Sequence, residues 1–232
     1  MRIKSALLLV SSFVLSARNQ CSDFHADIVI LLDAADDTGL AAFNHQKQFA
    51  KSLTKWLPRV GADCKVKVVP YSWTIDRPLA DFSKDASRWQ QNSILSKANY
   101  ERRKGPRRPM VRIARDLVDK HFRPSEVRSD AKQIAIVVTS EAPETKSRSD
   151  IVKSFFSGIA DDRVPFVIVV GVGQTDSIKH LMKLAENPCN VLTVPTFDKL
   201  SISLPIVKQR LCEIMASGQA NPKGNTSFYI KT

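Results

Sequence analysis

The sequence lacks the short motifs by which many enzymes are identified. It contains no G-x-S-x-G string of the kind that holds a catalytic serine. The string Gly171-Val172-Gly173 resembles part of a dinucleotide-binding loop, but Asp176 stands where that loop has its third glycine. No His/Cys or Ser/His pair stands at the end of a predicted strand. We therefore predict a protein that is not an enzyme and that holds no cofactor.

Cysteine and histidine are scarce, and long apolar runs are absent. The four cysteines include no C-x-x-C pair and the four histidines are scattered, so zinc ligation by these residues is not expected. No apolar stretch reaches the roughly 20 residues that a membrane-spanning helix needs. The sequence therefore predicts no membrane span.

The first 17 residues have the pattern of a secretory signal peptide. Arg2 and Lys4 precede an apolar stretch from Ala6 to Leu15, and small residues follow it. This pattern predicts entry into the secretory pathway, with release outside the cell or storage in secretory organelles. In an oxidising compartment an even number of cysteines favours two disulfides. The residues concerned are Cys21, Cys64, Cys189 and Cys212.

Basic residues outnumber acidic ones, 35 to 23, which gives a formal net charge of +12. Loss of Arg2 and Lys4 with the signal would leave about +10. A secreted protein with this charge is expected to bind anionic partners such as sulfated glycans or acidic proteins. Nucleic acid is not an expected partner of a secreted chain.

Continuous apolar runs predict strands that are buried on both faces of a parallel sheet. They are Asp27–Asp33, Lys132–Thr139 and Pro165–Gly171. Further strands are predicted at Cys64–Tyr71, Asn190–Val194 and, as a short edge strand, Ile75–Leu79.

Helical spacing of apolar residues separates these strands. The predicted helices are Leu40–Leu57, Ser83–Ala98, Met110–Phe122, Lys146–Ala160, Thr175–Glu186 and Leu200–Met215. Strands that alternate with helices indicate a mostly parallel sheet covered on both faces. We predict one α/β domain over residues 18–216 and a flexible tail over residues 217–232.

The strings DIVILLD, KQIAIVVTS and PFVIVVGVGQTD, in this order and spacing, resemble the first, fourth and fifth strands of a von Willebrand factor type A domain. The resemblance implies a three-layer, doubly wound sheet of order 3-2-1-4-5-6 with one antiparallel edge strand. The segment CNVLTVPTFDKLSISLPIVKQRLC, together with Cys21, resembles the type A domains of thrombospondin-related adhesins of apicomplexan parasites. We expect a small, secreted, single-domain relative of such adhesins.

Type A domains bind a divalent cation at a metal-ion-dependent adhesion site, and this sequence departs from its pattern. Asp33 matches the first aspartate, but Ala35 and Asp37 stand where the family has two serines. The threonine position falls near Pro109, and Ser140 replaces the aspartate after the fourth strand. The resemblance therefore implies a degenerate site.

Two interpretations of the remaining acidic residues stay open. Asp33, Asp37 and Glu141, with Asp36 nearby, could form an altered site for Mg²⁺ or Ca²⁺, which prefer oxygen ligands. Alternatively, Asp33 accepts hydrogen bonds from backbone amides at the strand end while the other three carboxylates are solvated.

Residues 102–115 (RRKGPRRPMVRIAR), called the basic segment below, concentrate seven cations at the end of the sheet where type A domains bind ligands. Arginine binds sulfate and carboxylate groups in bidentate fashion. The predicted ligand-binding residues are Arg102, Arg103, Lys104, Arg107, Arg108 and Arg112. A solvated loop or a dibasic processing site is the other interpretation.

These observations predict a secreted adhesion domain that recognises an anionic extracellular ligand, such as heparin or another glycosaminoglycan, without the usual metal. Two alternatives remain: a metal-dependent adhesin with the altered cation site, and a structural module that assembles into homo-oligomers.

The disulfide pairing is left open among three possibilities. In the implied fold, strands 2 and 6 are four positions, or about 19 Å, apart, so a direct Cys64–Cys189 bond is difficult. The pairs Cys21–Cys64 and Cys189–Cys212 would require the loops to reach less far. The bond Cys21–Cys212 is what the resemblance implies, because many type A domains join their termini in this way.

Overall fold

The computed structural model describes residues 25–57, 63–72, 80–82, 95–96, 98–100, 105–106, 110–140, 156, 164–173 and 178–217. The predicted signal peptide, the strand at 75–79, the helix at 146–160 apart from residue 156, and the tail beyond residue 217 lie outside this range. So does most of the helix predicted at 83–98. These expectations remain predictions.

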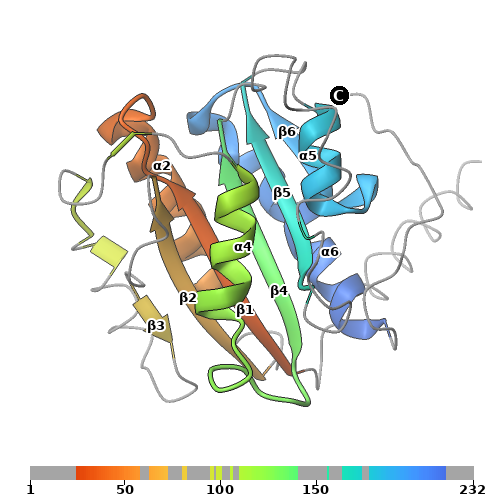
Figure 1. Ribbon diagram of the computed structural model, residues 1–232. Helices are drawn as coiled ribbons and strands as arrows, with labels where there is room; N and C mark the ends of the chain where they lie inside the picture. Colours follow the sequence, from red (N-terminus) through yellow and green to blue (C-terminus); the bar gives the residue numbers. More distant parts are fainter. Residues whose placement is uncertain are drawn as a thin grey trace, which may run out of the picture.

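Six strands form one sheet of order β3-β2-β1-β4-β5-β6 (Figure 1). They are β1 His25–Asp33, β2 Asp63–Tyr71, β3 Ala80–Phe82, β4 Lys132–Thr139, β5 Phe166–Val172 and β6 Val191–Val194. Five of them run parallel, and β3 pairs antiparallel with β2. The predicted α/β class, a doubly wound sheet, is confirmed.

Helices cover both faces of the sheet. Helices α2 (Gly39–Trp56) and α6 (Leu200–Ala216) share one hydrophobic cluster with one face. Helices α4 (Met110–His121) and α5 (Ile178–Ala185) pack on the other, which faces the viewer in Figure 1. Two short 3₁₀ helices, η5 (Pro188–Asn190) and η6 (Phe197–Lys199), precede β6 and α6. No helix in the described part of the chain is long and apolar enough to span a membrane.

Strand β1 lies between β2 and β4, which explains the unbroken apolar run over residues 28–32. Every residue of β1 after His25 is buried. Successive side chains point to opposite faces, so Ile28 and Ile30 join the cluster under α2 and α6, while Val29 and Leu31 join the cluster under α4. A strand with apolar neighbours on both faces needs apolar residues at every position.

Glycine allows α5 to approach the sheet closely. A Cβ atom added at Gly171 of β5 would lie 2.4 Å from Cδ1 of Leu181 in α5. Real Cβ atoms do not make contacts this short, so another residue at position 171 would force the end of the Leu181 side chain to move.

The parallel strands give the sheet two chemically distinct ends. We call the end where β1, β4 and β5 finish the upper end, and the end where they begin the lower end. Open α/β sheets generally bind ligands at the carboxyl ends of their strands, which is the upper end here.

Candidate functional site

At the upper end, the carboxylate of Asp33 is fully buried and bonded to neutral groups. Its Oδ1 accepts a hydrogen bond from the Ala35 amide at 3.1 Å. Its Oδ2 accepts from the amide and the hydroxyl of Ser140, at 3.2 and 3.1 Å. Asp33 thus joins the ends of β1 and β4, and these contacts correspond to the capping interpretation of this residue.

The backbone of Asp33 is held from the helix side by Gln46 of α2. The Gln46 side chain accepts from the Asp33 amide at 2.7 Å and donates to its carbonyl at 2.9 Å. Gln46 is fully buried, and its two bonds replace the strand hydrogen bonds that are lost where β1 ends. The sequence analysis missed this residue, because a polar side chain within a helix gives no local sign of its partner.

Tyr100 fixes the loop between β1 and α2. Its hydroxyl donates to the Ala35 carbonyl at 2.8 Å and accepts from the Gly39 amide at 3.1 Å. Its buried ring packs on Phe43 of α2, with the ring centroids 5.4 Å apart. The sequence analysis did not find these hydroxyl contacts.

Gly105 is fixed on the same loop. The Asp36 amide donates to the Gly105 carbonyl at 2.9 Å, and Ala35 forms a parallel bridge with Gly105. Tyr100 and Gly105 therefore both bind the loop after β1 and flank residues 101–104. Of the predicted ligand-binding residues, Arg102, Arg103, Lys104, Arg107 and Arg108 lie outside the described residues.

The described cations nearest in sequence to residues 101–104 lie on α4. Arg112 and Arg115 are exposed, and Arg112 is the third residue of the helix. The first turn of α4 contains no acidic residue. The helix macrodipole places partial positive charge at this end, so a cation there is unfavourable by about 0.3–1 kcal/mol, whereas an anion is favoured.

The described residues do not offer the ligand set of a hard cation. Mg²⁺ and Ca²⁺ need about six oxygen ligands, whereas both Asp33 oxygens are engaged by protein donors. Ala35 has no side-chain oxygen, Asp36 and Asp37 are exposed, and Glu141 lies outside the described residues. Within the described part of the chain, no three His, Cys, Asp or Glu side chains converge as a metal site would require.

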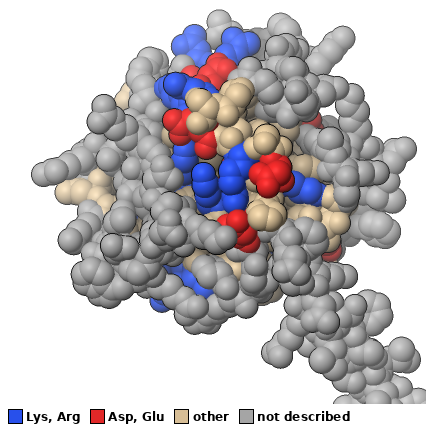
Figure 2. Space-filling model, turned by 90° about the horizontal axis from the view of Figure 1, so that it is seen from below, with Lys and Arg blue, Asp and Glu red and all other residues tan. Residues whose placement is uncertain are grey.

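At the lower end, Arg128 joins three segments, and we call this group the Arg128 cluster. Its backbone amide donates to Asp27 at 2.7 Å, and its guanidinium binds the other Asp27 oxygen at 2.9 Å. The guanidinium also binds the carbonyls of Ala26 and Asp63 and forms an ion pair with the Asp63 carboxylate at 3.0 Å. Figure 2 shows this face, on which basic and acidic side chains are interspersed.

The cysteines depart from the expected pattern. Neither Cys64 nor Cys189 forms a disulfide, so the expectation of two disulfides is wrong. Cys64 lies on β2 and Cys189 directly before β6, four strands away. Four strand spacings are about 19 Å, whereas the Cα atoms of a disulfide lie within roughly 7 Å of each other. Cys212 is disulfide-bonded, and Cys21 lies outside the described residues.

Burial makes Cys64 chemically inert. It raises the pKa of the Cys64 thiol to about 12, against the opposing influence of Arg128. The thiolate is the reactive form of cysteine. Cys64 is therefore a poor nucleophile.

The fold and the upper end define a class: a doubly wound α/β domain in which Asp33 ends the first strand, at the end where such sheets bind ligands. The family profile described as the von Willebrand factor type A domain matches residues 27–204. The chain therefore belongs to this family, and the predicted resemblance is confirmed. A comparison with curated proteins finds no match.

Solved structures with a similar fold include proximal thread matrix protein 1 from the mussel byssus. One crystal form has a TM-score of 0.65 at 20% identity over 82% of this chain. A second structure has a TM-score of 0.66 at 19% identity, and a third, whose metal-ion-dependent adhesion site is occupied by zinc, has 0.64 at 19%. This chain spans about half the length of the mussel protein, 49%, 48% and 49% in the three structures. At this identity the likeness shows the fold alone.

Proposed function

We propose that this protein is a secreted binding domain that recognises an anionic extracellular ligand, a sulfated glycan or an acidic protein, at the upper end of its sheet. Binding requires no metal ion. The observation that carries this proposal is the exposed Arg112 in the first turn of α4. A cation at this helix end opposes the macrodipole, so it lowers stability unless an anion binds there.

The contacts of Tyr100 and Gly105 support a fixed position for the base of the basic segment. Both residues bind the loop after β1, through hydrogen bonds of 2.8–3.1 Å. Binding residues on loops depend on such a scaffold, because a positioned loop has less conformational entropy to lose when its ligand binds.

The hydrogen bonds of Asp33 support independence from metal. A ligand carboxylate in the usual adhesion site binds a cation, and the aspartate at the end of the first strand helps to hold that cation. Here the Asp33 oxygens accept from Ala35 and Ser140 instead. The attraction for an anion then comes from arginine and lysine side chains, and it weakens steeply with salt.

Retention of the mature protein on heparin across a salt series, with magnesium or with a chelator, tests this function. We expect retention that falls steeply with salt and is the same in both conditions. The double variant Arg107→Glu with Arg108→Glu should lose retention at physiological salt.

A matched control separates the site from net charge. The double variant Lys51→Glu with Lys55→Glu on α2 changes net charge by the same amount, away from the basic segment. It should elute close to the wild type. Equal losses in both double variants, or retention only with magnesium, would contradict the proposal, and the second result would favour the altered cation site.

Self-assembly is the second candidate function. Its support is the fold shared with a matrix protein of the mussel byssus. Light scattering over a range of concentrations tests it, because an assembling module increases in mass with concentration. A constant monomer mass would remove this candidate and leave the heparin result unaffected.

A further inference from the structure

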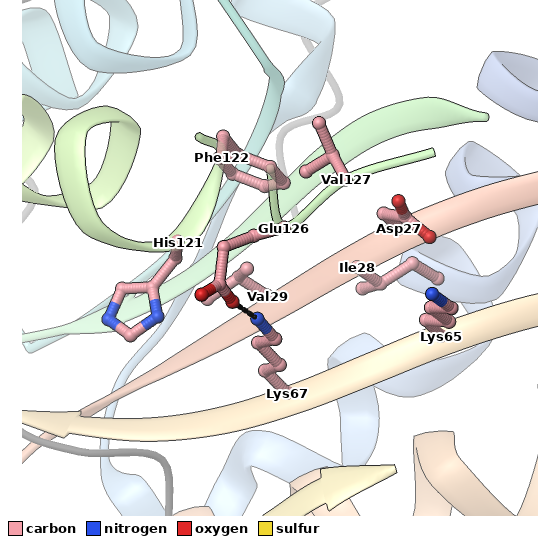
Figure 3. Close-up of a pocket in the computed structure, with 9 residues that line it drawn as sticks. All are labelled: Asp27, Ile28, Val29, Lys65, Lys67, His121, Phe122, Glu126 and Val127. Atoms are coloured by element: carbon pink, nitrogen blue, oxygen red, sulfur yellow. Dashed lines mark hydrogen bonds and ion pairs between the residues drawn. The ribbon is translucent and has the colours of Figure 1, made fainter. Parts of the chain in front are cut away.

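His121, in the last turn of α4, is a buried imidazole with an unpaired nitrogen. The residue is 6% exposed, and within the described part of the chain its Nε2 has no hydrogen-bond partner. It lines a pocket of about 20 Å³ between α4 and the strands β1 and β2 (Figure 3). This volume holds about one water molecule. The pocket has no room for an organic ligand, so the reaction to consider here is the protonation of the His121 imidazole.

Positive charge comes toward His121 from each element around it except β1. Strand β2 and helix α4 contribute one lysine each, and the connection after α4 contributes one arginine. These cations are Lys67, Lys120 and Arg123. A second positive charge on His121 would be repelled by these neighbours and would lack the water that solvates an exposed imidazolium.

Two carboxylates line the same pocket, and each already binds a cation. Glu126 accepts a hydrogen bond from Nζ of Lys67 at 2.6 Å, as Figure 3 shows. Asp27 of β1 binds Arg128. The charge of Glu126 favours a protonated His121, but its effect is smaller than that of burial or of the charge of Lys67.

The energetic balance supports a neutral His121 in the closed structure. Burial, and next the charge of Lys67, lower the pKa of His121 to about 4. An exposed histidine has a pKa of about 6.5. A conformation that exposes His121 therefore binds a proton more tightly, and it gains in population as the pH falls from about 6.5 towards 4.

The segment that would open is the connection from α4 to β4, residues 122–131. It begins directly after His121 and carries both Glu126 and Arg128. Glu126 binds β2 through Lys67, and Arg128 binds β1 and β2 through Asp27 and Asp63. The same short segment thus holds the end of α4 to the lower end of the sheet.

We propose that residues 122–131 form an acid-operated latch, in which protonation of His121 releases this segment from β1 and β2. The closed form predominates at neutral pH. Acidification shifts the population towards a form in which the Lys67–Glu126 pair and the Arg128 cluster are broken.

Amide hydrogen exchange of residues 122–131 tests the latch. Exchange is compared between the wild type and His121→Gln at each pH from 7 to 4.5, so that the intrinsic pH dependence of exchange cancels. We expect the wild-type-to-variant ratio to rise about tenfold per pH unit below pH 6.5. A ratio that does not change with pH would overturn the proposal.

Two further measurements keep the test decisive. His45 is exposed on α2, so His45→Gln serves as a control and should retain the wild-type pH dependence. Titration of the His121 ring by NMR in the wild-type protein needs no variant that folds. A midpoint near that of an exposed histidine would also overturn the latch.

Discussion

The two ends of the sheet use charge differently. At the lower end, opposite charges are close and partly buried, as in the pairs of Arg128 with Asp27 and Asp63 and of Lys67 with Glu126. At the upper end, Asp33 is bonded to neutral donors, while Arg112 and Arg115 are exposed. Among the described residues, neither of these two arginines forms an ion pair. The lower end uses its charges to join segments, and the upper end leaves cations available.

On the proposed function, this difference separates the residues that stabilise the domain from those that bind its ligand. A buried charge that loses its partner costs several kcal/mol, so the charges at the lower end are constrained by the fold. Exposed cations change stability little and can be used for recognition. Substitutions at the two ends should therefore differ in both the size and the kind of their effects.

Arg128→Met should have the largest effect on stability. It removes the guanidinium that binds Asp27 and Asp63, and it leaves Asp27, which is 6% exposed, as a buried carboxylate with one backbone donor. We expect the free energy of unfolding in urea to fall by about 3–5 kcal/mol.

Arg123→Met is the control for Arg128→Met. Arg123 is exposed in the same connection, and its loss should change stability by less than about 0.5 kcal/mol. Similar losses in the two variants would contradict a special role for the Arg128 cluster. Heparin retention at the upper end should survive both substitutions.

A single disulfide at Cys212 should contribute the next largest effect. Cys212 is disulfide-bonded, while Cys64 and Cys189 are not. We therefore expect unreduced peptides to join Cys212 to Cys21 in mass spectrometry. Cys212→Ser should lower the free energy of unfolding by about 2–5 kcal/mol, whereas Cys64→Ser should not alter the peptide map. Any peptide that contains a Cys64 disulfide would contradict this prediction.

Asp33→Ala tests whether Asp33, which matches the first aspartate of the family's adhesion site, stabilises the fold or binds a metal ion. The variant leaves the amides of Ala35 and Ser140 without their acceptor. Thermal and urea unfolding should show a loss of about 2 kcal/mol. Asp36→Ala, at an exposed neighbour, should change little.

Magnesium sharpens this test of Asp33. A cation that binds only the folded state raises its stability. Because the Asp33 oxygens are already engaged, we expect magnesium to leave the melting temperature of the wild type and of Asp33→Ala unchanged. An increase in the wild type that is lost in the variant would show that Asp33 holds a cation.

Most of the described fold could be predicted from local sequence. Strands β1, β4 and β5 are buried on both faces, so each is a continuous apolar run with few alternatives. The predicted bounds of α2 and α4 also lie within one residue of the observed ones, because both helices have apolar residues at helical spacing. Strand β3 (Ala80–Phe82) was not predicted, because three residues are too few to show an alternating pattern. The strand predicted at 75–79 lies outside the described residues and stays a prediction.

The contacts within both ends could not be predicted in the same way. Hydrogen bonds from backbone amides to Asp33 were one of the two interpretations that the sequence left open. The partners of Gln46, Tyr100 and Arg128 were not found, since they lie 13 to 102 residues away along the chain. A single sequence contains no signal for such pairs. The cysteine count likewise suggested two disulfides, although the distance between β2 and β6 prevents a bond between Cys64 and Cys189.

Arg112→Gln should have the smallest effect on stability and the most informative one. Removing a cation from the first turn of α4 should raise the free energy of unfolding by about 0.3–1 kcal/mol, because it relieves the unfavourable macrodipole contact. The same change should weaken heparin retention. Lys120→Gln, in the last turn of the same helix, removes an equal charge where the dipole favours it and also breaks a pair with Asp116. It should therefore lower stability slightly and leave retention unchanged. A gain in stability together with a loss of heparin retention is expected only if the Arg112 cation serves a ligand rather than the fold. A variant that loses both stability and retention would show that Arg112 supports the fold, as the charges of the lower end do.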